Sequence, residues 1–266
     1  MPLAVCATPI GNLEDVTLRV LAELRAADVV LAEDTRHTRG LLERHGIKAR
    51  LLSYHEHNEA ARVAELLPRL AAGERVALVS DAGMPVVSDP GARIVRAALE
   101  AGLPVTVLPG PSAVETALVA SGLGGGRYAF VGFLPRKAGE LDALWRELAG
   151  WEWPVVAFES AQRLPAALRS LAAVDPGREV AVCRELTKRF EEVARGTAEE
   201  LAARFAEAPK GEITLVLGAA AGTADSATAH AAVADLVAAG TPRGVAAEVV
   251  ARLTDTSRND LYRRSL

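Results

Sequence analysis

A run of polar residues with the chemistry of an active site follows one of the apolar stretches of the chain. The segment Glu33–Thr38 reads Glu-Asp-Thr-Arg-His-Thr and comes directly after the apolar run Val29–Ala32. Its carboxylate and imidazole groups can accept a proton, and its guanidinium group can hold a phosphate. Asp34 or Thr35 can also cap a helix that begins here. The segment therefore has a catalytic interpretation and a purely structural one.

A second polar segment, Ser53–Glu59, contains two histidines. His55 and His57 are two positions apart, so they share one face if the segment is extended. A zinc site needs a third and a fourth ligand, and no cluster with zinc spacing occurs elsewhere in the sequence. We therefore expect no metal and interpret this segment as a polar loop that faces the substrate.

Three further segments combine glycine with polar residues where apolar runs end: Thr8–Leu13, Val79–Pro85 and Leu108–Ala113. An acid such as Asp81 can accept a hydrogen bond from a ribose hydroxyl, and Gly83 lets the backbone approach a ligand closely. Ser112 can cap a helix or help to hold a ligand carboxylate. The G-x-G-x-x-G pattern of dinucleotide folds is absent, so these segments do not form a dinucleotide-binding fingerprint.

These segments need a scaffold, and the hydrophobic pattern predicts an α/β fold with mainly parallel sheets. Short, nearly continuous apolar runs predict strands that are covered on both faces, at Leu3–Ala7, Val29–Ala32, Val76–Ser80, Val105–Leu108, Val155–Glu159, Val180–Cys183 and Ile213–Leu217. Helical periods lie between them, at Leu18–Arg25, Ala60–Leu70, Ile94–Ala101, Ala113–Ser121, Gly139–Leu148, Leu164–Ala173 and Ala198–Ala206. Ligands of open α/β sheets bind beyond the carboxyl ends of the strands, where the polar segments stand.

Composition and charge narrow the class of protein. The chain has 266 residues and a net charge of −4, which excludes a highly basic protein that coats nucleic acid. Its two cysteines cannot form a disulfide framework. We expect neither a signal peptide nor a membrane span, and hence a cytoplasmic protein. The charge is uneven, because Arg36–Arg50 contains five basic residues and one acid.

Taken together, ten ordered segments resemble one family. They are Thr8–Leu13, Ala32–Thr38, His55–Glu59, Val79–Pro85, Asp89–Gly91, Leu108–Ser112, Gly132–Lys137, Phe158–Ser160, Arg184–Lys188 and Lys210–Glu212. In this order they resemble the small-subunit ribosomal RNA cytidine 2′-O-methyltransferases of the tetrapyrrole methylase superfamily. The first loop lacks the G-x-G-x-G-D of the relatives that act on tetrapyrroles, which fits the RNA branch.

The resemblance implies a class III methyltransferase fold of two α/β domains, residues 1–113 and 114–220, with a helical tail at 221–266. It implies S-adenosylmethionine in the cleft between the two domains and a homodimer. The cofactor residues carried over from the family are Pro9, Ile10, Asp81, Gly83, Met84, Ser112, Ala113, Phe158, Leu186, Glu212 and Ile213. The family often has a small residue where Met84 stands.

The implied reaction is methylation of the 2′-hydroxyl of a cytidine in the decoding region of 16S ribosomal RNA, within the small subunit. We expect Asp34 or His37 near this hydroxyl as the base, and Arg36 on a phosphate. The residues expected to contact RNA are Arg36, Arg39, Arg136, Lys137, Lys188, Arg258 and Arg263.

The helical tail also fits the branch of the family that acts on RNA. A helix at Gly244–Leu253, a turn at Asp255–Ser257 and a basic helix at Arg258–Leu266 resemble a small nucleic-acid-binding element. A helical hairpin that packs on the body or on a dimer partner is the structural alternative. Methylation of a tetrapyrrole or of a protein side chain, and RNA binding without catalysis, are the alternative functions.

Overall fold

A computed structural model describes residues 2–220, 226–254 and 256–264. The chain forms two compact units. The first consists of Met1–Ala120, Cys183–Val193 and Gly211–Thr214, and the second of Ser121–Val182, Ala194–Lys210 and Leu215–Leu266. The domain limits at residues 113 and 220 remain a prediction.

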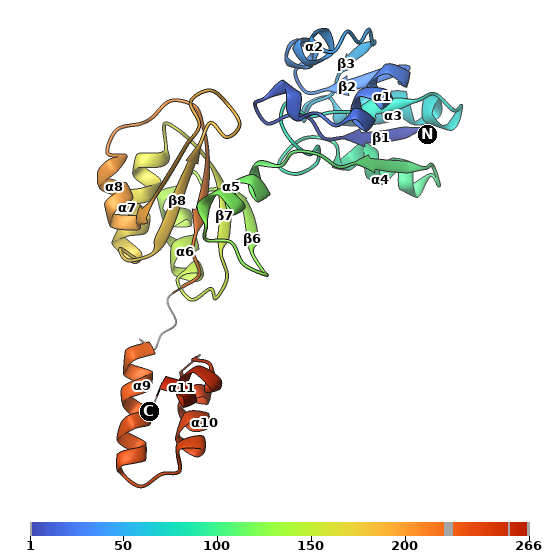
Figure 1. Ribbon diagram of the computed structural model, residues 1–266. Coiled ribbons are helices and arrows are strands. Elements are labelled where there is room, and N and C mark those ends of the chain that lie inside the picture. Colours follow the sequence, from blue (N-terminus) through green and yellow to red (C-terminus); the bar gives the residue numbers. More distant parts are fainter. Residues whose placement is uncertain (1, 221–225, 255, 265–266) are drawn as a thin grey trace. The chain divides into compact units, whose positions relative to one another are not determined.

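The first unit contains a parallel five-stranded sheet (Figure 1). Its strands lie side by side in the order β3-β2-β4-β1-β5, and each neighbouring pair is parallel. The carboxyl ends of all five strands therefore meet at one edge. The bounds are Leu3–Cys6 (β1), Val29–Ala32 (β2), Leu51–Ser53 (β3), Val76–Leu78 (β4) and Val105–Leu108 (β5).

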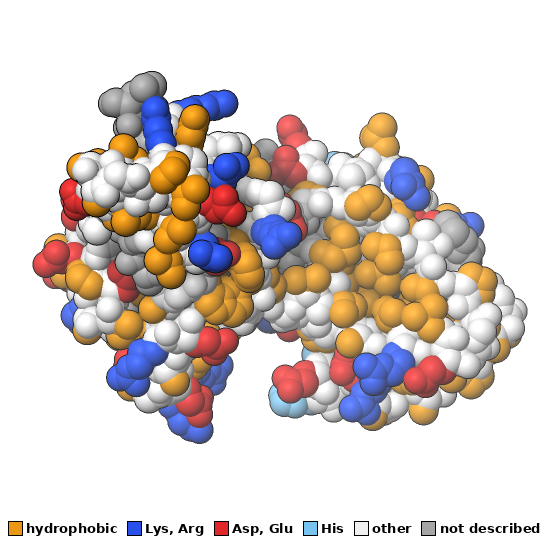
Figure 2. Space-filling view, turned by 90° about the horizontal axis from the view of Figure 1, so that it is seen from below, with side chains coloured by type: hydrophobic (Ala, Val, Ile, Leu, Met, Phe, Trp, Pro, Cys, Tyr) orange, Lys and Arg blue, Asp and Glu red, His pale blue; other side chains and the backbone are white. Residues whose placement is uncertain are grey.

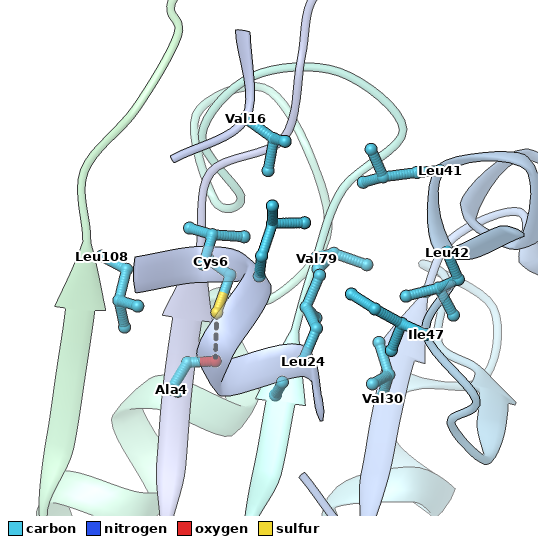
Figure 3. Close-up of a cluster of buried hydrophobic side chains, with 14 residues drawn as sticks. Ala4, Cys6, Val16, Leu24, Val30, Leu41, Leu42, Ile47, Val79 and Leu108 are labelled. Carbon is cyan, nitrogen blue, oxygen red and sulfur yellow. Dashed lines mark hydrogen bonds between the residues drawn. The ribbon is translucent and has the colours of Figure 1, made fainter. Parts of the chain in front are cut away.

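Successive residues of the central strands point into two different cores, which explains their continuous apolar sequences. In β1, Ala4 and Cys6 belong to one cluster, whereas Leu3 and Val5 belong to the other. The first cluster, drawn in Figure 3, is covered by α1 (Leu18–Ala26) and α2 (Thr35–Arg44). The second is covered by α3 (Glu59–Ala71) and α4 (Ala92–Glu100). Helices on both faces confirm the predicted α/β class.

The second sheet is mixed. Its strands lie in the order β6-β7-β10-β8-β9, and β6 and β7 are parallel. Hydrogen bonds from Gly218 N–H to Glu179 O and from Glu185 N–H to Glu212 O join opposite ends of β10 and β8, so these two strands are antiparallel. The bounds are Ala129–Phe133 (β6), Val155–Ser160 (β7), Glu179–Arg184 (β8), Glu192–Thr197 (β9) and Glu212–Leu217 (β10).

The remaining helices of the body are α5 (Ala113–Ser121), α6 (Ala138–Leu148), α7 (Leu164–Val174) and α8 (Ala198–Arg204), with a short 3₁₀ helix, η1, at Leu13–Asp15. Helix α7 packs against both α6 and α8. No helix within the described ranges is long and apolar enough to cross a membrane.

The tail forms three helices, α9 (Ser226–Ala238), α10 (Arg243–Leu253) and α11 (Arg258–Arg264). They share a small core of Ala229, Val233, Ala246, Ala247, Val250 and Leu261. The Arg243 guanidinium also lies over the Tyr262 ring, 4.7 Å from its centre. The two expected helices are present as α10 and α11, whereas Asp255 of the expected turn and residues 265–266 lie outside the described residues.

Three strands of the body were not expected from the sequence, β3, β6 and β9, and α2 was expected only as the structural interpretation of Glu33–Thr38. Helix α2 buries only Thr38, Leu41 and Leu42, so its sequence is dominated by polar residues. The register of β6 against β7 shifts between Phe130 and Phe133, which breaks the alternation expected of a strand. Strand β9 lacks the continuous apolar run that marked the other strands, and β3 is only three residues long.

Candidate active site

The loops after β1 and β4 are bonded to each other at the carboxyl edge of the first sheet. Thr8 N–H donates to Gly83 O at 2.8 Å, and Gly83 N–H donates to Thr8 O at 3.1 Å. The buried Thr8 hydroxyl also donates to Ser80 O at 3.1 Å. Two of the segments expected to hold the cofactor are therefore fixed side by side.

Gly83 marks the point where three loops converge. Its φ is +79°, a conformation that favours glycine. A Cβ added there would lie 3.5 Å from Ile10 Cγ2 and 3.6 Å from Pro111 O. The sequence-predicted residues Ile10 and Gly83 thus meet next to the segment that carries Ser112. A side chain at position 83 would project into the space between these loops, so glycine keeps the backbone accessible to a ligand.

The other expected cofactor residues of these loops have defined partners. Pro9 is buried, and Ala113 begins α5 half-buried. The Ser112 hydroxyl donates to the Glu115 carboxylate in the first turn of α5. The half-buried Met84 side chain packs against the apolar cluster under α3 and α4.

Asp81 joins the β4 loop to the β2 loop. Its Oδ1 accepts a hydrogen bond from Asp34 N–H at 3.0 Å. One oxygen of this predicted ribose acceptor therefore positions the segment that carries the expected catalytic residues. The geometry connects the cofactor candidates with Asp34, Arg36 and His37.

Asp34 caps α2 and pairs with Arg36. Its side chain accepts from Arg36 N–H at 2.8 Å, and the Arg36 guanidinium donates to both carboxylate oxygens, at 3.1 and 2.7 Å. These bonds hold the pKa of Asp34 well below its usual range. A carboxylate with so low a pKa is a weak base. The capping interpretation of this segment is confirmed, and the His37 side chain is exposed on the first turn of the helix.

Two carboxyl groups interact with Asp81: Glu33, which lies in a segment singled out from the sequence, and Asp89, whose role was not identified. Burial, followed by repulsion from Asp81, raises the pKa of Glu33. Burial and repulsion from Glu33 and Asp81 raise the pKa of Asp89 to about 6, against a hydrogen bond with Ser80 that lowers it. The sequence signal was the echo of Ser80-Asp81-Ala82-Gly83 in Ser88-Asp89-Pro90-Gly91.

The segment Ser53–Glu59 forms an ordered turn between β3 and α3. Asn58 accepts from His55 N–H at 2.9 Å and donates to Ser53 O at 3.1 Å. Glu59 Oε1 accepts from Gly91 N–H at 2.9 Å, so this residue anchors the loop that contains Asp89. The anchoring role of Glu59 was also not identified from the sequence.

The later cofactor candidates divide between the two units. Leu186 and Ile213 are buried, Glu212 is exposed, and all three belong to the first unit. Phe158 belongs to the second unit, where its ring makes edge contacts with Phe130 and Phe133 at centroid distances of 4.9 and 5.4 Å.

The expected RNA-binding residues are also divided. Arg36, Arg39 and Lys188 belong to the first unit, and Arg136, Lys137, Arg258 and Arg263 to the second. All except Lys188 are exposed. Lys188 is part of an ion-pair network, because its Nζ lies 3.0 Å from Glu185 Oε1 and 2.8 Å from Glu212 Oε2.

Comparison with known proteins adds independent information. A protein of Mesorhizobium japonicum, named ribosomal RNA small subunit methyltransferase I, is 44% identical over 99% of this chain and 91% of its own length. A protein of the same name from Thermotoga maritima is 45% identical over 81% of this chain and 97% of its own length.

Solved structures share the fold at lower identity. The methyltransferase CobJ matches 84% of this chain and 96% of its own, with a TM-score of 0.63 and 20% identity. Uroporphyrin-III C-methyl transferase from Thermus thermophilus, complexed with S-adenyl homocysteine, matches 81% and 96%, with a TM-score of 0.56 and 21% identity. The family model of tetrapyrrole (corrin/porphyrin) methylases matches residues 2–202. The chain therefore belongs to the tetrapyrrole methylase family and is a methyltransferase.

Proposed function

We propose that the chain methylates the 2′-hydroxyl of a cytidine ribose in the decoding region of 16S ribosomal RNA. It is an S-adenosylmethionine-dependent methyltransferase that acts on ribosomal RNA. The observation that carries this assignment is the 44% identity, over 99% of the chain, to a ribosomal RNA small subunit methyltransferase I. The nucleotide and the oxygen that is methylated go beyond that name and rest on the ten motifs of the sequence.

The residues at the carboxyl edge of the first sheet fit the cofactor. Gly83 leaves free the space between Ile10 and Pro111 that a Cβ would enter. The Asp81 carboxylate holds the Asp34 amide with Oδ1, so we assign its Oδ2 to a ribose hydroxyl of the cofactor. S-adenosylmethionine, when bound, supplies a methyl group that is activated by the sulfonium. The protein contributes orientation, worth up to about 7–11 kcal/mol in well-aligned reactions.

His37 is the proton acceptor that we propose for the ribose hydroxyl. Asp34, the other candidate, is committed to the helix cap and to Arg36, and its low pKa makes it a weak base. Asp34 instead holds Arg36 for a phosphate of the RNA. The His37 side chain is exposed next to this pair, as a residue that meets a large substrate must be.

The test is turnover with saturating RNA. His37→Ala should lower kcat by about 10²–10⁴-fold, with unchanged affinity for S-adenosylmethionine. Asp34→Asn should chiefly raise KM for RNA, because the Arg36 guanidinium loses its charged partner. If His37→Ala turns over at the wild-type rate, His37 is not the base.

We propose the small ribosomal subunit as the substrate particle in the cytoplasm, and RNA contacts from Arg36, Arg39, Arg136, Lys137, Lys188, Arg258 and Arg263. Binding should weaken with salt, with a slope of log K on log salt near −0.7 for each contacted phosphate of a single strand. A flat salt dependence would contradict these contacts.

We also propose a homodimer. Hydrophobic side chains gather on one face of the first unit (Figure 2). Val107, on the edge strand β5, is 54% exposed, and Val119, on the apolar helix α5, is 81% exposed. Exposed apolar surface of this kind is typical of subunit interfaces. Light scattering should give the mass of two chains, and Val119→Glu should yield monomers.

A further inference from the structure

A cavity of about 500 Å³ opens in the first unit, directly after the loop expected to hold the cofactor. Its walls are the segment Gly11–Glu14, Arg44 at the end of α2, and the segment Thr187–Arg189. All of these residues belong to the first unit. Gly11, the first residue of the cavity wall, directly follows Ile10 of the expected cofactor loop. We call this cavity the Asn12 pocket.

The walls of the Asn12 pocket are fixed by direct contacts. Asn12 N–H donates to the Thr187 hydroxyl at 3.0 Å. Gly11 lies so close to the opposite wall that an added Cβ would be 2.4 Å from Lys188 Cγ. The ion pairs of Lys188 with Glu185 and Glu212 hold that wall in turn. The pocket is therefore preformed rather than a gap between loose loops.

Three basic residues, Arg44, Lys188 and Arg189, line the pocket beside one acid, Glu14. Lys188 is ion-paired with Glu185 and Glu212, so Arg44 and Arg189 are the cations that can meet a ligand. Glu14 pairs with Arg44 at 2.9 Å, but both side chains are more than half exposed. Such a surface pair contributes little free energy, so Arg44 can exchange this partner for a phosphate at small cost. The pocket thus suits an anionic ligand.

An exposed aromatic ring stands beside this charge. Phe190 is 66% exposed, and the Arg189 guanidinium lies 5.5 Å from the centre of its ring. An aromatic face next to an arginine is the arrangement with which proteins stack the bases of single-stranded nucleic acid and hold its backbone. Charge and ring therefore indicate the same kind of ligand.

We propose that the Asn12 pocket and Phe190 hold a nucleotide of single-stranded RNA that flanks the methylated nucleotide. Its phosphate contacts Arg44 and Arg189, and its base stacks on Phe190. The inference rests on the proposed function, because it takes RNA as the substrate. It adds a binding subsite that neither the motifs nor the names of the relatives assign.

The test is binding of a fluorescein-labelled single-stranded RNA of about ten nucleotides to the full-length protein, followed by anisotropy. Phe190→Leu keeps an apolar side chain without a ring face and should weaken binding by about tenfold, whereas Phe190→Tyr should bind as the wild type. Arg189→Gln should weaken binding and reduce the salt slope by about 0.7. Arg96→Gln, an exposed position on α4, is the matched control and should change neither quantity.

Two further measurements separate this proposal from the proposed function. Calorimetry should show unchanged S-adenosylmethionine affinity in Phe190→Leu, and small subunits at saturating concentration should be methylated at the wild-type kcat with a raised KM. If the wild type methylates RNA and both Phe190→Leu and Arg189→Gln bind the probe as the wild type does, the subsite is wrong. If the wild type binds the probe but transfers no methyl group to RNA, that result contradicts the proposed function rather than the subsite.

Discussion

Asp89 gives the sharpest prediction about the first unit. Its pKa of about 6 lies above the ordinary value of 3.8, because the carboxyl group is half-buried and faces Glu33 and Asp81. A raised pKa means that the neutral carboxyl fits the fold better than the carboxylate does. The stability that this group contributes is fully present below pH 3.8 and is lost as the pH rises through about 6.

The magnitude follows from the shift. About two pKa units correspond to at most about 3 kcal/mol, and partial contact with solvent reduces this to about 1–2 kcal/mol. Asp89→Asn cannot ionise, and its side-chain oxygen can still accept from the Ser80 hydroxyl. The variant should therefore be more stable than the wild type by about 1–2 kcal/mol at pH 8 and nearly equal to it at pH 4.

The assay is urea denaturation followed by circular dichroism at pH values from 4 to 8. Protection of the β1 and β4 amides from hydrogen exchange assigns the effect to the first unit. Glu33→Gln is the second variant, because loss of its charge should lower the pKa of Asp89 and shrink the pH dependence. A difference between Asp89→Asn and the wild type that stays constant across this pH range would refute the reasoning.

Three other predictions concern single positions. Gly83→Ala should cost about 1 kcal/mol, because φ is positive there, and should weaken S-adenosylmethionine binding in calorimetry; unchanged affinity would place the cofactor elsewhere. Thr17→Ala should cost about 1 kcal/mol, because the Thr17 side chain caps α1 by accepting from Val20 N–H; an unchanged urea midpoint would argue against the cap. Leu78→Ala should cost about 2–5 kcal/mol, because Leu78 is buried in β4, whereas the exposed Leu99→Ala should stay within about 0.5 kcal/mol; equal effects would contradict the two-sided core.

The sequence predicted the elements whose burial leaves a hydrophobic pattern. The strands Val29–Ala32 and Val105–Leu108 and the helix Ala113–Ser121 have the predicted bounds. Strand β9 reads Glu-Val-Ala-Arg-Gly-Thr, and its charged residues hide the alternation that marks a strand. The interior of the fold was therefore more predictable than its partly solvated elements.

The sequence predicted which loops form the candidate site, but it did not predict the contacts between those loops. The sequence predicted ligand contacts for Gly83 and Asp81 because a glycine and an acid follow an apolar run there. That Asp81 holds the Asp34 amide depends on the adjacency of β2 and β4, which the chain order does not reveal. The raised pKa of Asp89 depends in the same way on Glu33, a residue distant in sequence.

The central claim is tested most directly by locating the transferred methyl group. Purified protein and isotope-labelled S-adenosylmethionine are incubated with isolated small subunits, free 16S ribosomal RNA and a tetrapyrrole in parallel, and the products are digested and analysed by mass spectrometry. We predict label on the ribose of a single cytidine in small-subunit RNA, at the 2′-oxygen. Label on the tetrapyrrole, or on a base instead of a ribose, would contradict the account.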